Sequence, residues 1–233
     1  MIKLIDSLPS YGKTDLPLVR IHCNFAAYGN FPKIALFWAQ TDEKGKVTAL
    51  LCMIDGSLTV TENGADTDEL REFISALGAR DILCSKELAE KIGFEIFKIC
   101  TVLRADPPHK TENAIENTGE GVNRLYEMLK NDFELEKEAF LADVSHRVRH
   151  NCAFFVTSPF AAGLCLYSEK FALINGICTL KEKRGTHIGS AVLARIKSGI
   201  RQKPLFVASQ NADNFYLKNN FTVCGQAAYC KGI

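Results

Sequence analysis

The same order of extended and helical segments occurs twice along this chain of 233 residues. In each half, apolar stretches typical of strands are followed by an amphipathic helix, a strand, a short helix and a final strand, and in the second half two helices precede this run. The ends of the halves can be superposed in sequence, because residues 91–94 (KIGF) resemble residues 218–221 (KNNF). This order predicts two tandem α/β units of related architecture.

Hydrophobic periodicity locates the expected elements of both halves. In the first half we expect strands at residues 34–40, 46–54, 81–84 and 94–103, and helices at about 66–78 and 86–92. In the second half we expect helices at about 122–129, 134–149, 186–200 and 211–219, and strands at 152–157, 161–168, 171–180, 205–209 and 221–229. Residues 105–111, with paired prolines, interrupt the periodicity and predict a linker. The expected domains are therefore residues 1–111 and 112–233.

Composition limits the classes of protein to which the chain can belong. Apolar residues make up 47% and charged residues 24%, so a compact core is expected. A net charge of +1 argues against a dedicated nucleic-acid-binding protein. The N-terminal apolar stretch is too short for a signal peptide, and the longest apolar runs are far too short to span a membrane. We expect a cytoplasmic protein without a membrane partner.

The nine cysteines lie mostly inside apolar runs, and no Cys-x-x-Cys pair occurs. Zinc ligands and disulfides are the functional alternatives, but this placement favours small buried side chains in a reducing compartment. We therefore expect no metal site.

The passage from residue 177 to residue 193 is the segment most informative about chemistry. A strand leads into a basic loop with Lys181, Lys183 and Arg184, and the loop opens a helix. A helix start offers unpaired backbone N–H groups and the positive end of the helix dipole, which suit phosphate. The alternative is an ordinary turn between a strand and a helix, with a solvated run of charges.

This passage resembles the pyrophosphate loop of the GNAT superfamily of N-acetyltransferases, whose pattern is Gln/Arg-x-x-Gly-x-Gly/Ala after a strand. Arg184 and Gly189 fit this pattern, whereas His187 replaces its first glycine. A second resemblance follows downstream, where residues 211–221 are similar to the family ending Asn…Ala-x-x-Phe-Tyr-x-Lys-x-Gly-Phe, with Asn220 in place of the glycine. Both segments occur in the family's order, separated by a helix and a strand.

The resemblance implies a mixed, mostly antiparallel sheet flanked by helices, and it implies a binding site for acetyl-CoA as co-substrate. The backbone of residues 177–179 would hold the pantetheine arm, and the amides of residues 185–190 would bind the pyrophosphate. Tyr216 would protonate the departing thiolate; the alternative is a half-buried core tyrosine. The residues expected to bind the co-substrate are Ile177, Cys178, Thr179, Arg184, Gly185, Thr186, His187, Ile188, Gly189, Ser190 and Asn211.

The first half does not carry this pattern. Its matching passage, residues 58–69, has four carboxylates and no Lys or Arg, so it would repel a pyrophosphate. Under the superposition given above, Ala89 stands where the second half has Tyr216. We expect the first half to bind no CoA and either to form one wall of the acceptor site or to stabilise the second half.

Residues 146–150 contain a further candidate. His146 and His150 would share one helix face, which is compatible with a metal, but no third ligand accompanies them in a recognised motif. Arg147 or Arg149 would be placed to contact an acidic acceptor group, and a solvated helix face is the alternative.

The resemblance implies an enzyme that transfers an acetyl group from acetyl-CoA to an amine. A non-catalytic acyl-CoA-binding or regulatory module is the main alternative, and a structural protein without CoA is a third. The sequence does not identify the general base; Glu182 and a water chain are both candidates. The acceptor is a small-molecule or peptide amine, with polyamines, aminoglycoside-like compounds, amino acids and protein N-termini all open.

Overall fold

The computed structural model describes residues 1–107, 120–130, 132–133, 135–200 and 202–232, apart from the side chain of Glu120. It contains two compact units. Unit 1 comprises Met1–Leu103, Ala208–Lys218 and Thr222–Ile233, and unit 2 comprises Arg104–Val207 and Asn219–Phe221. The expected boundary between residues 111 and 112 lies outside the described residues, as does position 134, where the second helix of the second half was expected to begin.

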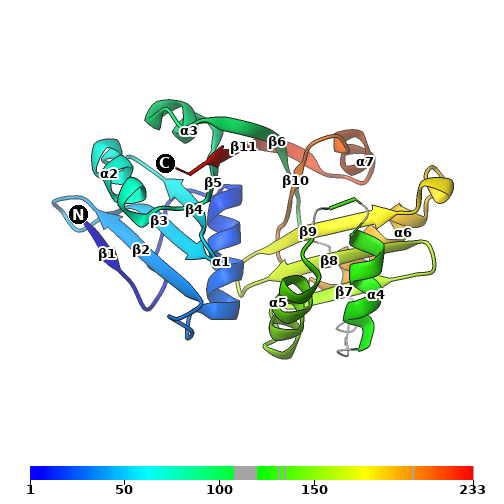
Figure 1. The fold of residues 1–233 in the computed structure, drawn as a ribbon. Coiled ribbons are helices and arrows are strands. Elements are labelled where there is room, and N and C mark those ends of the chain that lie inside the picture. Colours follow the sequence, from blue (N-terminus) through cyan, green and yellow to red (C-terminus); the bar gives the residue numbers. More distant parts are fainter. Residues whose placement is uncertain (108–119, 131, 134, 201, 233) are drawn as a thin grey trace. The chain divides into compact units, whose positions relative to one another are not determined.

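Unit 1 is built on a mixed sheet whose strands lie in the order β1-β2-β3-β4-β5-β11-β6 (Figure 1). The elements of its N-terminal part are β1 (Ile2–Leu4), α1 (Leu16–Tyr28), β2 (Ala35–Thr41), β3 (Val47–Ile54), β4 (Ser57–Glu62), α2 (Thr67–Leu77), β5 (Asp81–Ser85), α3 (Lys86–Ile92) and β6 (Ile96–Ala105). Its C-terminal part contributes α7 (Asp213–Lys218) and β11 (Thr222–Lys231). Strands β4 and β5 are parallel, whereas β1–β2, β2–β3, β3–β4 and β5–β11 are antiparallel.

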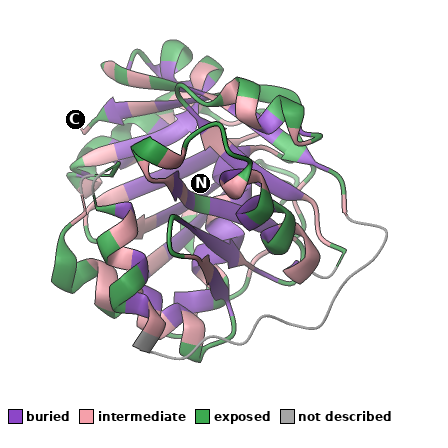
Figure 2. Ribbon diagram, turned by 90° about the vertical axis from the view of Figure 1, so that its right-hand side faces the viewer, coloured by how far each residue is buried: buried purple, intermediate pink, exposed green. Residues whose placement is uncertain are grey.

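Both faces of this sheet are covered by helices. Helix α1 contacts β2, β3, β4 and β5, and on its side Phe25 packs edge-on against Phe37, with ring centroids 5.0 Å apart. Leu58 and Val60 of β4 face the opposite side, where they share a buried core with Leu70 of α2 and Leu88 of α3. Buried residues accordingly concentrate on the strands (Figure 2).

The helix ends are defined by local signals in the sequence. Asp66 caps α2, and Gly78 ends it with φ 61°, in the left-handed region that glycine tolerates best. Ser85 caps α3, and Gly93 ends it with φ 82°. These ends lie where the sequence predicts them.

The C-terminal strand β11 completes the core of unit 1. It pairs with β5 in an antiparallel register that sets Ala228 opposite Cys84 and Tyr229 opposite Leu83. Ala228 and Cys230 are fully buried in the same core as Leu70 and Leu88. The last strand of the second half therefore packs with elements of the first half.

Unit 2 is a four-stranded sheet in the order β10-β9-β8-β7. Its elements are α4 (Glu120–Leu129), α5 (Lys137–Arg149), β7 (Ala153–Thr157), β8 (Ala161–Tyr167), β9 (Ala172–Thr179), the 3-10 turn η1 (Lys181–Lys183), α6 (Ile188–Gly199) and β10 (Leu205–Ser209, which enters unit 1 at Ala208). Strands β7, β8 and β9 are antiparallel, and β9 and β10 are parallel.

Helix α6 packs on one face of this sheet, and α4 packs on the other. A Cβ added to Gly163 would lie 2.7 Å from the Cδ1 of Ile196 in α6. A Cβ added to Gly176 would meet the side chain of Leu129 in α4 at 3.4 Å. Glycine at these positions lets both helices approach the strands closely.

The two halves share one order of elements. The run β2-β3-β4-α2-β5-α3-β6 is matched by β7-β8-β9-α6-β10-α7-β11. Asn220, which aligns with Gly93, adopts the same left-handed conformation, with φ 61°. The predicted fold class, mixed and mostly antiparallel sheets flanked by helices, is confirmed. Strands β1 and β4, helix α1 and the 3-10 turn η1 were not among the elements expected from the sequence.

In the part of the chain that the structure describes, no helix has the length and apolar character needed to cross a bilayer.

We expect Ala228→Glu to destabilise the protein strongly, because it places a charge in the fully buried core of unit 1. The free energy of unfolding should fall by about 3 kcal/mol or more, measured by urea denaturation. The matched control is Gln226→Glu, on an exposed position of the same strand. It should change stability by no more than about 0.5 kcal/mol. Equal stability of the two variants would contradict the assignment of β11 to this core.

Candidate functional site

The start of α6 presents backbone amides that have no acceptor within the helix. Its hydrogen bonding begins at Ala191, whose amide donates to the carbonyl oxygen of His187 at 3.0 Å. The amides of Ile188, Gly189 and Ser190 precede this bond and form no bond of their own to the described residues. The first turn of α6 carries no acidic residue, and no side chain caps it. This helix start has the features of an anion site.

His187 adopts a backbone conformation that glycine tolerates better than residues with a Cβ. Its φ is 63° and its ψ is 2°, in the left-handed region, and it is the N-cap of α6. Gly185 is also left-handed, with φ 82°, and nothing lies within 4 Å of a Cβ added there. A glycine at position 187 could follow the same backbone path without strain.

Strand β9 has one open edge at its C-terminal end. It pairs with β10 only from Ala172 to Ile174, whereas its pairing with β8 continues to Thr179. Among the described residues of unit 2, no strand pairs with the other edge of β9 beyond Ile174. Residues 175–179 therefore offer backbone groups on this edge.

The hydrogen-bond alternation shows which backbone groups face the open edge. The amide of Leu180 donates to the carbonyl oxygen of Phe160 at 2.9 Å, so Leu180 and alternate residues before it bond toward β8. Ile177 and Thr179 consequently direct their N–H and C=O groups to the open edge. An extended ligand with amide groups of its own could pair with this edge as a strand does.

A β-bulge marks the point where the open edge begins. Leu164 pairs with Gly176 and Cys165 pairs with Ile174, which leaves Asn175 without an opposite residue. Asn175 is exposed within an otherwise largely buried strand. Bulges are common next to functional sites, where they redirect a side chain. The sequence analysis did not single out this position, although a glycine inside an apolar strand, here Gly176, is a recognised signal for a bulge.

Arg184 joins the loop to two other parts of unit 2. Its Nε donates to the carbonyl oxygen of Thr179 at 3.1 Å, and its Nη2 lies 3.1 Å from both carboxylate oxygens of Asp132. Lys183 places its ammonium 4.9 Å from the ring centroid of Phe160. The loop thus carries positive charge that is partly paired and remains close to the surface.

The thiol of Cys178 points away from the α6 side of the sheet. Its Sγ donates to the carbonyl oxygen of Met128 in α4 at 3.3 Å. Burial raises the pKa of this thiol. The protonated form is therefore favoured, which suits a structural side chain better than a nucleophile.

Tyr216 and Asn211 belong to unit 1, whereas residues 177–190 belong to unit 2. Tyr216 lies in α7 with only 4% of its surface exposed, and burial raises its pKa well above the ordinary value for tyrosine. The phenol is therefore protonated throughout the neutral range and is chemically able to donate a proton. Asn211 is exposed and precedes α7.

The histidine pair of α5 forms a stacked surface feature. The ring centroids of His146 and His150 lie 4.1 Å apart. No group of three His, Cys, Asp or Glu side chains suited to a metal occurs among the described residues. Arg147 is buried and donates to Asp143 at 2.8 Å, so it supports the helix internally. Arg149 is exposed.

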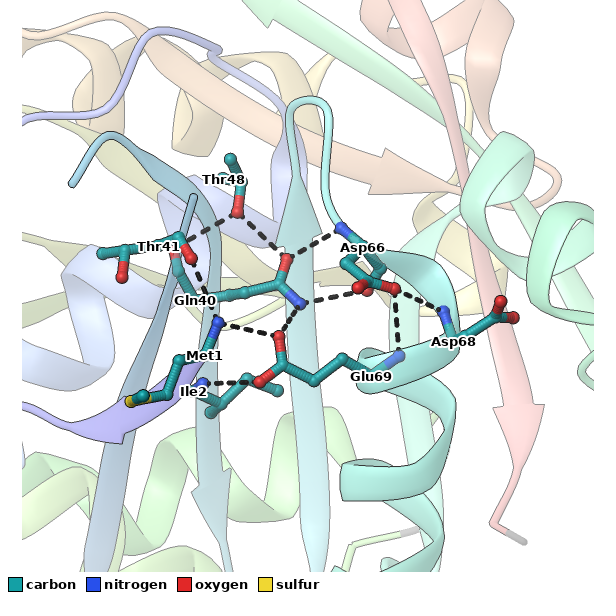
Figure 3. Close-up of polar contacts among 8 residues, drawn as sticks. All are labelled: Met1, Ile2, Gln40, Thr41, Thr48, Asp66, Asp68 and Glu69. Atoms are coloured by element: carbon teal, nitrogen blue, oxygen red, sulfur yellow. Dashed lines mark hydrogen bonds and ion pairs between the residues drawn. The ribbon is translucent and has the colours of Figure 1, made fainter. Parts of the chain in front are cut away.

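In unit 1 the corresponding helix start is occupied by the chain's own carboxylates (Figure 3). The carboxylate of Asp66 accepts hydrogen bonds from the amides of Asp68 and Glu69, each at 3.1 Å. Glu69 in turn binds the N-terminal ammonium of Met1 at 2.9 Å and accepts from the side chain of Gln40 at 2.8 Å. Burial opposes ionisation of Glu69, but these hydrogen bonds prevail and lower its pKa. A pyrophosphate does not fit here.

Side chains of the N-terminal segment also contact the C-terminal end of strand β4 in unit 1. Pairing between β4 and β5 ends at Thr59. Beyond it, the Lys13 ammonium donates to the carbonyl oxygen of Glu62 at 3.0 Å, and the hydroxyl of Thr61 donates to the carboxylate of Asp15 at 2.9 Å. Lys13 satisfies one backbone carbonyl at the end of β4, as Arg184 does for Thr179 at the end of β9, and the Thr61 contact involves a side-chain hydroxyl.

Solved structures of GNAT acetyltransferases share this fold. A GCN5-related N-acetyltransferase from Kribbella flavida matches with a TM-score of 0.58 and 14% identity, over 79% of this chain and 86% of that chain. An acetyltransferase from the GNAT family of Colwellia psychrerythraea matches with a TM-score of 0.53 and 12% identity over the full length of both chains. A tandem GNAT protein from the clavulanic acid biosynthesis pathway matches with a TM-score of 0.52 and 11% identity, over 84% of this chain and 81% of that chain.

No protein-family model and no curated protein matches the chain. At these identities the structural matches establish the fold alone: the chain has the GNAT fold, and a tandem GNAT protein is among the structures that share it.

We expect His187→Gly to stabilise the protein. The substitution removes the cost of a left-handed conformation in a residue with a Cβ, which outweighs the extra freedom of glycine in the unfolded chain. The free energy of unfolding should rise by about 0.5–1 kcal/mol. Thr186→Gly, at an exposed neighbour outside the left-handed region, is the control and should not stabilise. A loss of stability in His187→Gly would contradict the assigned loop conformation.

Proposed function

We propose that this protein transfers an acetyl group from acetyl-CoA to an amine, with CoA bound by the second half of the chain and not by the first. One observation carries the proposal: the first amides of α6 have no acceptor among the described residues, whereas the matching amides of α2 are capped by the carboxylate of Asp66. The GNAT fold, common to known acetyltransferases, supports acyl transfer in general.

The proposed roles follow the geometry of unit 2. The amides of residues 185–190 receive the pyrophosphate, because the helix start leaves them without acceptors and favours negative charge. The pantetheine arm runs along the open edge of β9, where Ile177 turns its N–H and C=O outward. Four residues of strand span about 13 Å from Thr179 to Asn175, so an arm of this kind ends near the bulge. Asn211 completes the proposed set of co-substrate contacts.

The reaction requires a neutral amine nitrogen. The nitrogen attacks the thioester carbonyl carbon, a C–N bond forms, the C–S bond breaks, and the nitrogen loses a proton. Tyr216 donates its phenolic proton to the departing sulfur and is reprotonated from solvent. The products are an amide and free CoA. The proton from the amine passes to water or to Glu182, which is exposed beside the loop. We place the protein in the cytoplasm, where its free thiols stay reduced.

The second candidate function is a non-catalytic acyl-CoA-binding or regulatory module. The burial of Tyr216 favours it, because a phenol with 4% of its surface exposed also fits a purely structural role in α7.

Calorimetric titration should find one acetyl-CoA per chain. Gly189→Val should weaken this binding at least tenfold, about 1.4 kcal/mol, because a side chain at the helix start keeps phosphate away from the amides. The control is Ala65→Val, in the loop before α2, which should leave affinity unchanged. Circular dichroism should show that both variants are folded. A stoichiometry near two, or unchanged affinity in folded Gly189→Val, would contradict the proposed site.

Tyr216→Phe separates the enzyme from the binding module. If the phenol protonates the thiolate, substrate binding should barely change, because the interaction exists mainly in the transition state. Turnover should fall by about a hundredfold to ten-thousandfold, followed as free thiol release with an amine chosen from a panel of polyamines, aminoglycosides, amino acids and peptides. Phe215→Leu, a neighbouring change that keeps the phenol, is the control. Equal turnover of Tyr216→Phe and wild type would remove this role, and a panel without any turnover would favour the module.

A further inference from the structure

Arg184 and Asp132 form an ion pair beside the proposed pyrophosphate site. Nη2 of Arg184 contacts both carboxylate oxygens at 3.1 Å, while its Nε holds the carbonyl oxygen of Thr179. The two side chains are 52% and 32% exposed. An ion pair this exposed contributes little to stability, so its exchange for another anion is easy.

Asp132 follows the end of α4 and is held there by backbone hydrogen bonds to that helix. Its amide and that of Phe133 donate to the carbonyl oxygen of Leu129, each at 3.0 Å. The side chains of Leu129 and Phe133 pack against the position of Gly176 in β9, and the carbonyl of Met128 binds Cys178. The end of α4 is therefore anchored on β9. This anchoring keeps the Asp132 carboxylate next to Arg184 in the loop before α6.

A carboxylate and a phosphate compete for the same guanidinium. Both present paired oxygens that match its planar set of N–H donors. A pyrophosphate at the start of α6 carries more negative charge than Asp132 and gains the amides of the helix as well. It would therefore draw Arg184 away from Asp132 and leave the carboxylate to solvent.

We propose that Asp132 is a positioning residue that holds Arg184 in the absence of ligand and competes with the pyrophosphate for it, thereby accelerating the release of CoA. This inference rests on the function proposed above. Product release limits the turnover of many enzymes, so a competing carboxylate at this position would favour turnover over tight binding. In a purely structural role, by contrast, Asp132 would brace the loop, and its loss would weaken binding.

The sign of the effect of Asp132→Asn distinguishes these two roles. Under the proposal, the variant binds CoA and acetyl-CoA about two- to fivefold more tightly, the range expected for one exposed ion pair. The gain should appear as slower dissociation of CoA in stopped-flow displacement. Weaker or unchanged binding in a folded variant would overturn the proposal.

Two further variants test whether Arg184 mediates the effect. Glu169→Gln removes the same charge at the turn before β9, at the far end of the strand from Thr179, and should leave affinity unchanged. In an Arg184→Gln background no ion pair remains to be broken, so the gain from Asp132→Asn should shrink. An equal gain in both backgrounds would show general repulsion of the ligand and would overturn the role of Arg184. If the wild type binds no CoA, the proposed function itself fails, which is a separate result from any change of sign.

Discussion

The chemistry proposed for this chain depends on the short pairing between the parallel strands β9 and β10. Strand β9 pairs with β10 for three residues, from Ala172 to Ile174, and then continues with β8 as its only partner within unit 2. A buried edge without hydrogen bonds is costly, so an unpaired edge is kept only where water or a ligand satisfies it. The bulge at Asn175, the outward groups of Ile177 and the free amides of α6 all follow this separation along the chain. The acceptors missing from the strand edge and from the helix start are what a CoA molecule would supply.

In unit 1, the chain's own side chains occupy the helix start that corresponds to the start of α6. Its strand β4 also leaves its parallel neighbour after three pairs, and α2 also begins just beyond β4. There, side chains of the same unit bind these polar groups. Asp66 caps α2, and Glu69 binds the N-terminal ammonium. Lys13 and Asp15 contact the end of β4. The two units differ at the helix start: Asp66 caps the first amides of α2, whereas the amides of residues 188–190 at the start of α6 have no acceptor among the described residues. This contrast supports the proposal that the second half of the chain binds the co-substrate.

Local signals in the sequence predicted most elements, because caps and periodicity act over a few residues. Helix α2 runs between Asp66 and Gly78 as expected, and α3 occupies residues 86–92. Helix α1 was missed because it is buried on nearly all sides, and a helix without a polar face has no amphipathic period. Strand β1 has only three residues and depends on pairing with β2. Propensity alone rarely identifies such a strand.

The sequence predicted only the part of the candidate site that is formed by contiguous residues. The loop and the start of α6 lie where the motif places them, whereas the ion pair of Arg184 with Asp132 joins residues far apart in sequence and carries no motif. The role of Tyr216 stays a prediction. His187 could be recognised as a departure from the pattern, but only the backbone dihedrals reveal that it lies in the left-handed region.

The position of β11 has a consequence for how the protein is made. Strand β5 is synthesised long before its partner, and ribosomes add about 5–20 residues each second, so the two are separated by on the order of ten seconds or more. During that interval the sites that Ala228 and Cys230 later cover are exposed along β5, next to Cys84. The nascent first half then carries an unpaired apolar strand edge, the kind of surface on which chains aggregate and chaperones act. Folding of unit 1 is thereby tied to the completion of nearly the whole chain.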